Sequence, residues 1–274
     1  EKAFKILQAA VNNGINSFDT ASAYGNSEEV LGSFFSSEEC KSEVILTTKF
    51  KAVFEDKLSG AAIEKLIYDY VEQSLERLKI KKIPVYMLHS AKDMTQYGKI
   101  VPDTLRKLKR ENLIGKAGVS IYNPEEAEEM LKDDLYEAIQ LPMNLFDQRM
   151  VNSGILKKLK NSNIIVFVRS VFLQGLFFLD PMNLPVKLKM AKEPLLTLQK
   201  IAERENMGIA QIAISYIRDM EGVSSLVLGV ETPEQIIENV KLIDAPAISP
   251  ETTEELERCF KSAPILEIME GLRL

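Results

Sequence analysis

Histidine and cysteine are scarce in this chain of 274 residues, which contains one histidine and two cysteines. A structural zinc site takes about four ligands, mostly of these two types, so a site of that kind is not expected. The two cysteines, Cys40 and Cys259, are far apart in the sequence and do not make a disulfide framework. This cysteine usage favours a reducing, cytoplasmic location.

An excess of basic residues and a long apolar run are also missing. Lys and Arg number 34 against 40 Asp and Glu, which gives a net charge of −6. A chain of this charge has no positive field that attracts nucleic acid or an anionic membrane. No apolar stretch reaches the roughly 18 residues that a transmembrane helix needs. We therefore expect neither nucleic acid nor a membrane as a partner, and the sequence leaves the oligomeric state open.

What is present is an alternation of short apolar runs and longer amphipathic segments. Hydrophobic residues make up 46% and charged residues 27%, as in ordinary globular proteins. The short runs are apolar without strict alternation, which is typical of parallel strands that are covered on both faces. The predicted strands are residues 15–21, 44–49, 84–90, 114–121, 138–143, 164–170 and 225–230.

Apolar residues at spacings of three and four predict helices between these strands. Residues 59–79 carry the clearest stripe, and residues 124–132 begin with Asn123 as a cap and Pro124 at the first helical position. Regular alternation of strands and helices argues for a parallel sheet with helices outside it. No linker of low complexity divides the chain, so we expect a single domain over residues 1–274. The predicted helices are residues 1–12, 59–79, 124–132, 194–206, 209–220 and 233–241.

The number of strands narrows the fold class. Seven strands are predicted, and a helix already precedes the first of them. An α/β fold of the (β/α)₈ TIM-barrel type would then lack its first strand here. Our hypothesis is that the N-terminus of the native protein is incomplete in this chain. A doubly wound open sheet of seven strands is the alternative.

Four polar side chains follow three consecutive strands. Asp19 and Tyr24 come at and after the end of the first strand, Lys49 ends the second, and His89 ends the third. The active sites of parallel barrels lie at the carboxyl ends of the strands, so these four side chains are expected to meet at one mouth. Each alone is more often structural or solvated than catalytic, but their joint arrival favours a catalytic site.

These residue types suit the reduction of a carbonyl group. Hydride addition leaves a developing alkoxide that needs a proton, and a free tyrosine has a pKa of about 10, too high for ready donation. An ammonium group from Lys49 would lower the pKa of Tyr24, and Asp19 would hold Lys49 charged and in place. His89 could donate a hydrogen bond to the carbonyl oxygen. A nicotinamide cofactor must supply the hydride, since no side chain can.

Residues 14–28 resemble the signature of the aldo-keto reductase family, with an Asp-Thr-Ala run at Asp19, then Tyr24-Gly25, then Ser27-Glu28. Thr47-Thr48-Lys49 is similar to the family's lysine strand and Leu88-His89-Ser90 to its histidine strand. The resemblance runs in family order from about residue 4 to residue 240. It implies a (β/α)₈ barrel, an extended NAD(P)H cofactor without a Rossmann domain, and catalysis by Asp19, Tyr24, Lys49 and His89. The absence of a Gly-x-Gly-x-x-Gly motif agrees with this.

The resemblance also implies a set of residues that bind the cofactor. Ser120 and Gln140 match residues that hold the nicotinamide carboxamide, and Ile121 stands where members usually have asparagine. Arg169 takes the place of a stacking aromatic ring; its positive charge is expected to favour the reduced cofactor. The residues matched to the pyrophosphate loop and to the adenosine end are Ser170, Val171, Phe172, Leu173, Gln174, Gly229, Glu231, Gln235, Glu238 and Asn239.

The adenosine end departs from the pattern of members that bind a 2′-phosphate. Gly229 and Gln235 stand where many members have Lys and Arg, and Glu231 adds a negative charge. A carboxylate disfavours a phosphate and can accept hydrogen bonds from a free ribose hydroxyl. The resemblance therefore places NADP(H), the usual cofactor of the family, only slightly ahead of NAD(H).

Two other functions are considered. A Ser/His hydrolase is disfavoured, because Ser90 and His89 are adjacent on a strand and point to opposite faces, and no Gly-x-Ser-x-Gly elbow is present. A regulatory, redox-sensing subunit with little turnover is the second alternative, since residues 232–239 resemble potassium-channel β-subunits of this family. The predicted function is reduction of an aldehyde or ketone to an alcohol. The sequence does not identify the small carbonyl substrate.

Overall fold

The computed structural model describes residues 1–37, 43–52 and 58–272. Cys40 lies outside these residues, and Cys259 is exposed with a free thiol. The chain forms two compact units. The first unit contains Glu1–Gln140, Asn163–Ile165 and Val230–Ile237. The second contains Leu141–Ser162, Val166–Gly229 and Glu238–Leu274, of which residues up to 272 are described.

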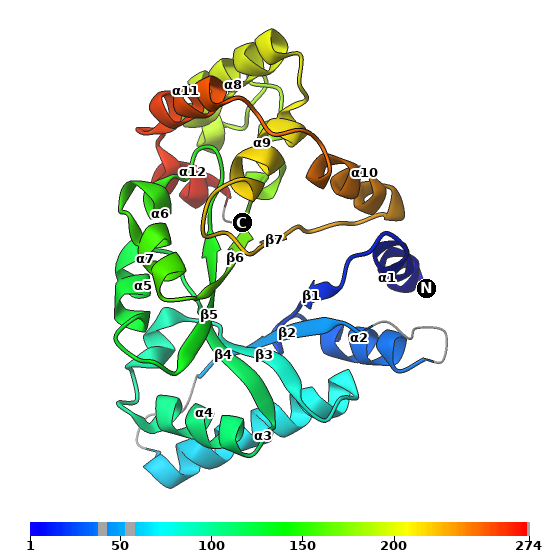
Figure 1. Ribbon diagram of the computed structural model, residues 1–274, viewed down its shortest axis with the longest axis vertical. Helices are drawn as coiled ribbons and strands as arrows, with labels where there is room; N and C mark the ends of the chain where they lie inside the picture. Colours follow the sequence, from blue (N-terminus) through cyan, green and yellow to red (C-terminus); the bar gives the residue numbers. More distant parts are fainter. Residues whose placement is uncertain (38–42, 53–57, 273–274) are drawn as a thin grey trace. The chain divides into compact units, whose positions relative to one another are not determined.

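The first unit is built on parallel strands that follow one another in chain order (Figure 1). The register places Asp19 beside Thr47 and Ser120 beside Gln140. Every strand therefore ends at the same edge of the sheet, where active sites of parallel sheets are found. The strands are β1 (Ser17–Asp19), β2 (Ile45–Phe50), β3 (Ile83–Leu88), β4 (Ile114–Ser120) and β5 (Tyr136–Pro142).

Helices alternate with these strands as the sequence predicts. The Ser59 hydroxyl accepts a hydrogen bond from Ala62 N and caps α3, whose apolar stripe is buried. Glu126 accepts a hydrogen bond from Asn123 N at 2.9 Å, as in a capping box, at the start of α5. The helices of this unit are α1 (Lys2–Asn12), α2 (Ser27–Phe35), α3 (Gly60–Leu78), the 3₁₀ turn η1 (Ala91–Met94), α4 (Ile100–Arg110) and α5 (Pro124–Met130).

A hydrophobic core lies between the first strands and the helices around them. Phe18 of β1 and Leu46 of β2 pack with Leu31 of α2 and Leu78 of α3. Ile236, in the first turns of α10 (Pro233–Ile243), belongs to the same core. The start of α10 is thus fixed to the first unit by buried apolar contacts.

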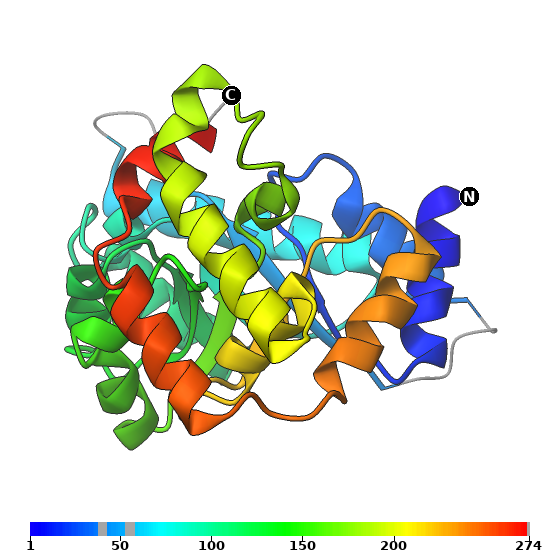
Figure 2. The same cartoon turned by 90° about the horizontal axis from the view of Figure 1, so that it is seen from above.

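The second unit contains the parallel pair β6 (Ile165–Arg169) and β7 (Ser225–Val227) with the helices that follow β5. Phe146 packs edge-on against Phe177 and is tilted against Phe260, with ring centroids 4.9 and 4.8 Å apart. Helices α8 and α11 lie side by side in Figure 2. The helices are α6 (Arg149–Asn152), α7 (Ile155–Asn161), η2 (Leu173–Phe178), η3 (Val186–Ala191), α8 (Lys192–Glu205), α9 (Ile209–Arg218), α11 (Pro250–Phe260) and α12 (Ile265–Leu272).

All seven predicted strands and all six predicted helices are confirmed, with ends that differ by a few residues. The largest difference is at β1, which covers Ser17–Asp19 instead of 15–21. Helices α2, α4, α6, α7, α11 and α12 were not predicted. Within the described residues no helix is long and apolar enough to cross a membrane. The same residues contain no group of three His, Cys, Asp or Glu side chains that could hold a metal ion.

Candidate active site

The four predicted catalytic residues all lie in the first unit, at the carboxyl ends of its strands. Asp19 is the last residue of β1, Lys49 precedes the last residue of β2, and His89 directly follows β3. Tyr24 lies in the short connection between β1 and α2. The backbone joins these ends, because His89 N donates to the carbonyl oxygen of Phe50 at 2.8 Å.

Lys49 and Asp19 form a buried ion pair. The ammonium nitrogen of Lys49 donates to both carboxylate oxygens of Asp19, each at 2.6 Å. The Lys49 side chain is fully buried and that of Asp19 is 17% exposed. A buried ammonium stays charged only where a negative group compensates its lost hydration, and the Asp19 carboxylate is in that place.

Tyr24 lies against both Lys49 and His89. The ammonium nitrogen of Lys49 is 5.5 Å from the centroid of the Tyr24 ring. The rings of Tyr24 and His89 meet edge to face, with centroids 5.6 Å apart. Tyr24 is 49% exposed, whereas Lys49 is buried. The Tyr24 ring is therefore half exposed and has the buried ammonium of Lys49 beside it.

Gln140 is a second residue that donates a hydrogen bond to the carboxylate of Asp19. The side-chain amide nitrogen of Gln140 donates to Asp19 Oδ1 at 2.8 Å. Ser120, its partner across β4 and β5, is also buried. A carboxamide carries both a donor and an acceptor, so this amide and hydroxyl fit the nicotinamide end of the expected cofactor. Ile121 is fully buried and apolar, so its side chain offers no third contact to a carboxamide.

A buried aspartate lies near this edge of the sheet, in η1 after His89. Asp93 accepts a hydrogen bond from Ala52 N at 3.2 Å, which links the connection after β3 to the connection after β2. Burial raises the pKa of Asp93, while the hydrogen bond from Ala52 and the charge of Lys51 oppose that change.

The predicted pyrophosphate loop lies in the second unit and has an unusual backbone. Ser170, Leu173, Gln174 and Gly175 all have positive φ, between 48° and 84°. The N–H groups of Leu173 and Gly175 donate within the loop, to the carbonyl oxygens of Ser170 and Phe172, each at 2.9 Å. Arg169 ends β6 directly before this loop, and its Nη1 donates to Ser170 Oγ at 3.4 Å. That this loop binds the pyrophosphate stays a prediction.

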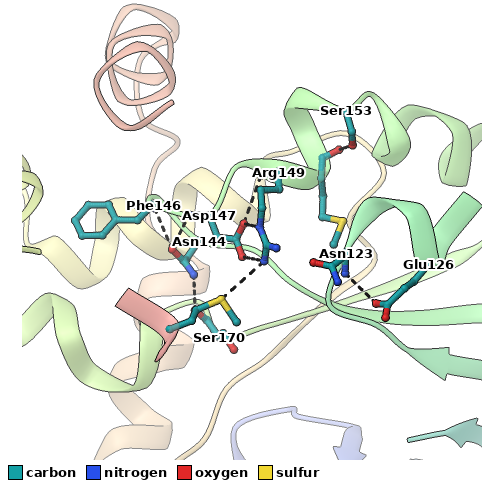
Figure 3. A network of polar contacts seen from close by, with 10 residues as sticks. Asn123, Glu126, Asn144, Phe146, Asp147, Arg149, Ser153 and Ser170 are labelled. Atoms are coloured by element: carbon teal, nitrogen blue, oxygen red, sulfur yellow. Dashed lines mark hydrogen bonds and ion pairs between the residues drawn. The ribbon is translucent and has the colours of Figure 1, made fainter. Parts of the chain in front are cut away.

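Asn144 supports this loop, and the sequence analysis did not identify it. Its side-chain nitrogen donates to the carbonyl oxygen of Ser170 at 3.2 Å, and its Oδ1 accepts from the backbone of Phe146 and Asp147 (Figure 3). Asp147 in turn accepts two hydrogen bonds from the guanidinium of Arg149, both at 2.8 Å, and one from its backbone nitrogen at 3.4 Å. Three polar residues so closely spaced after a buried strand were the signal that could have revealed this support.

The adenosine-end residues lie around the start of α10. The Thr232 hydroxyl accepts from Gln235 N at 3.3 Å, and Gln235 Oε1 accepts from Glu231 N at 2.7 Å. Gln235 therefore satisfies the backbone at the helix start, in the manner of a capping box, instead of extending toward a ligand. The carboxylate of Glu231 is exposed there.

The structure thus brings together Asp19, Tyr24, Lys49, His89 and Gln140, with Ser120 beside Gln140. It also brings together Glu231 and Gln235, and separately Arg169 with Ser170. The other cofactor residues are Val171, Phe172, Leu173, Gln174, Gly229, Glu238 and Asn239, all in the second unit. That all these residues line one groove stays a prediction.

Comparison with known proteins gives a match over nearly the whole chain. The model of the aldo/keto reductase family matches residues 1–261. The chain is 28% identical to the NADH-specific methylglyoxal reductase of Escherichia coli strain K12, over 89% of this chain and 85% of that protein. It is 24% identical to the L-glyceraldehyde 3-phosphate reductase of Escherichia coli O157:H7, over 92% of this chain and 82% of that protein.

Among solved structures, an aldo-keto reductase from Bacillus halodurans in its holo form superposes with a TM-score of 0.77. It is 22% identical, and the superposition covers 94% of this chain and 86% of that one. This likeness confirms the α/β barrel fold that the sequence predicts.

Proposed function

Because the chain belongs to the aldo/keto reductase family, we propose that Asp19, Tyr24, Lys49 and His89 are the residues with which it reduces its carbonyl substrate. The chain is an NAD(P)H-dependent oxidoreductase that converts an aldehyde or ketone to an alcohol. When bound, the nicotinamide supplies the hydride. The side chains of this protein supply the proton, the charge and the orientation.

In this proposal the Tyr24 hydroxyl donates its proton to the carbonyl oxygen as the alcohol forms. Proton loss leaves a phenolate, which the ammonium of Lys49 stabilises from the buried side of the ring. Asp19 keeps Lys49 charged and fixes its position. His89, packed edge-on against Tyr24, donates a hydrogen bond to the same carbonyl oxygen.

The observation that carries this proposal is the position of Lys49. Burial of the Lys49 ammonium costs free energy, and the carboxylate of Asp19 offsets part of that cost. The centroid of the half-exposed Tyr24 ring lies 5.5 Å from this ammonium nitrogen. The groups follow one another in the order that proton donation requires. The carboxylate of Asp19 holds the ammonium of Lys49, the ammonium supports the phenol of Tyr24, and the phenol donates to the substrate.

Ser120 and Gln140 would hold the nicotinamide carboxamide, with the loop from Arg169 to Gln174 on the pyrophosphate. Gly229, Glu231, Gln235, Glu238 and Asn239 would then lie at the adenosine end. The hydrogen bond from Gln140 to Asp19 supports this assignment, because it joins a proposed carboxamide residue to the proposed catalytic pair.

For the form of the cofactor we propose NADP(H), slightly ahead of NAD(H), as is usual in the family. The exposed carboxylate of Glu231 opposes a 2′-phosphate, and Gln235 is engaged at the start of α10. These two features keep the expected preference small. The methylglyoxal reductase of Escherichia coli noted above is NADH-specific by name, so NADH also serves a relative of this chain.

For the substrate we propose a small oxygenated aldehyde. Two relatives that match most of this chain are named for methylglyoxal and for L-glyceraldehyde 3-phosphate. Nothing in the comparisons supports the alternative of a regulatory subunit. The cytoplasmic location and the single domain stay predictions.

The test is turnover of the purified protein, followed by the loss of absorbance of NADPH and of NADH at 340 nm. The carbonyl panel contains methylglyoxal, L-glyceraldehyde 3-phosphate, an aromatic aldehyde and a simple ketone. Oxidation with at least one aldehyde is expected, and Tyr24→Phe should remove most of it. Full activity of that variant would contradict the proposed roles, and tighter binding of NADH would contradict the preference for NADPH.

A further inference from the structure

The first two residues of α2 hydrogen-bond the two strands that carry the Asp19–Lys49 pair. The hydroxyl groups of Ser27 and Thr20 are 2.5 Å apart, and Thr20 follows Asp19 directly. The Thr48 hydroxyl donates to Glu28 Oε1 at 2.6 Å, and Thr48 precedes Lys49 directly. One turn of one helix therefore contacts the chain neighbour of each member of the ion pair.

Glu28 is a buried charge that the proposed chemistry does not use. It is 1% exposed, and its second oxygen accepts a hydrogen bond from Arg77 Nη1 of α3 at 3.2 Å. Helices α2 and α3 lie very close together here. A Cβ atom on Gly32 of α2 would come within 2.0 Å of the carbonyl oxygen of Arg77 of α3. A buried carboxylate lowers stability unless both its oxygens are satisfied, so Glu28 is fixed by both partners.

The strand geometry relates Glu28 to Lys49. Successive side chains of a strand point to opposite faces of the sheet, so Thr48 faces α2 while Lys49 faces Asp19. A hydrogen bond that fixes Thr48 fixes the backbone from which Lys49 extends. The carbonyl oxygen of Lys49 is also held, since Ser22 N donates to it at 2.9 Å.

The same turn of α2 fixes the connection that carries Tyr24. Thr20 and Ser27 lie at the two ends of this connection, and their hydroxyl groups join them. Within it, Tyr24 N donates to the carbonyl oxygen of Ala21 at 2.9 Å, and Ser27 N donates to that of Tyr24 at 3.2 Å. The phenol and the ammonium are thus each attached to a backbone that α2 holds.

We propose that Glu28 is a positioning residue, which acts through Thr48 to keep the Lys49 ammonium at its distance from the Tyr24 ring. The proposal rests on the function proposed above and adds a residue that touches neither substrate nor cofactor. Small displacements of catalytic groups lower the rate of the chemical step by about 100-fold, whereas binding depends on other contacts. The effect should therefore fall on kcat and spare KM and cofactor affinity.

The test compares Thr48→Val with Thr48→Ser, since valine matches threonine in shape but lacks the hydroxyl. Thr48→Val should lower kcat on the order of 10- to 100-fold, with KM and the Kd of NADPH unchanged within about twofold. Thr48→Ser keeps the hydroxyl and should recover most of kcat. Because the chain has no tryptophan, the Kd of NADPH can be read from the fluorescence of the cofactor itself.

Glu28→Gln gives the second half of the test. Its amide nitrogen cannot accept a hydrogen bond, so either the guanidinium of Arg77 loses its acceptor or the Thr48 hydroxyl must turn from donor to acceptor. Both changes act on the same hydrogen bond, between Thr48 and Glu28. The loss of kcat in the double variant Glu28→Gln/Thr48→Val should therefore be no larger than in the more affected single variant. Multiplied losses would contradict the proposal.

Val71→Ala is the control for a merely structural role, since Val71 is a buried residue of α3, a helix that contains none of the proposed catalytic residues. It should lower Tm and leave kcat unchanged below the melting range. If Thr48→Val and Val71→Ala lose kcat in the same proportion to their loss of Tm, the proposal is wrong. If the wild-type protein oxidises neither cofactor with any carbonyl, the proposed function fails instead, and the kcat comparison does not arise.

Discussion

The ammonium nitrogen of Lys49 is 2.6 Å from each carboxylate oxygen of Asp19, and the lysine side chain is fully buried. Both charges depend on this contact, because neither residue has enough exposed surface to be hydrated as it is in the unfolded chain. The pair is consequently a structural element and, in our proposal, a part of the catalytic machinery.

Asp19→Asn should lower the free energy of unfolding by about 3–5 kcal/mol, since it leaves a buried ammonium without its counter-charge. Urea denaturation at neutral pH measures the loss. Asp69→Asn is the matched control, because Asp69 pairs with the exposed Lys65 at 3.0 Å. That change should cost no more than about 1 kcal/mol. Equal losses in the two variants would show that the Asp19–Lys49 pair adds no stability.

Tyr24→Phe should lower kcat by roughly 10²- to 10⁴-fold, because it removes the proposed proton donor and keeps the ring. The phenol is half exposed, so its loss should change stability little. Steady-state turnover at 340 nm gives kcat, and cofactor fluorescence gives the Kd of NADPH, which should not change. A variant that retains wild-type kcat would exclude Tyr24 as the donor.

His89→Gln should damage the carbonyl step more than cofactor binding. Glutamine keeps a hydrogen-bond donor but loses the edge-to-face contact with Tyr24. The loss of an oriented donor lowers kcat on the order of 100-fold or less when a donor of another shape replaces it. Single-turnover oxidation of bound cofactor measures this step directly. An unchanged single-turnover rate with weaker cofactor binding would assign His89 to the cofactor instead.

Asp93→Asn should change how stability depends on pH. Burial raises the pKa of Asp93, so the folded state binds more protons than the unfolded state above the ordinary value of 3.8. The wild-type protein therefore loses stability as pH rises from about 4 through the raised pKa. Asparagine keeps an acceptor for Ala52 N and does not titrate. The Tm of the variant should exceed that of the wild type at pH 7 and approach it at pH 4; a constant difference would contradict this.

Glu231→Gln should favour NADPH relative to NADH. Removal of an exposed negative charge near a 2′-phosphate gains about 0.2–1 kcal/mol, which is up to about a fivefold lower Kd for NADPH. The Kd of NADH should stay the same, because its ribose carries no phosphate. Glu72→Gln, an exposed change on α3, is the control and should alter neither constant. Equal effects on both cofactors would place Glu231 away from the 2′ position.

The sequence by itself determined the seven strands, the family and the four residues now proposed as catalytic. Apolar runs and helical stripes are local patterns, and Asp19, Tyr24, Lys49 and His89 each follow a strand at a recognisable place. Caps such as Ser59 on α3 and Asn123 with Glu126 on α5 are equally local, so they too could be predicted.

Only the tertiary structure decided which distant polar groups meet. The bond from Gln140 to Asp19 joins residues 121 positions apart, and the burial of Glu28 depends on Thr48 and Arg77, which come from two later elements. The tertiary structure also decided that the side chain of Gln235 accepts a hydrogen bond from Glu231 N at the start of α10. The physical reason is that a polar residue looks the same in the sequence whether it lies in water or in the interior. Its charge and its hydrogen bonds depend on the groups that folding places beside it.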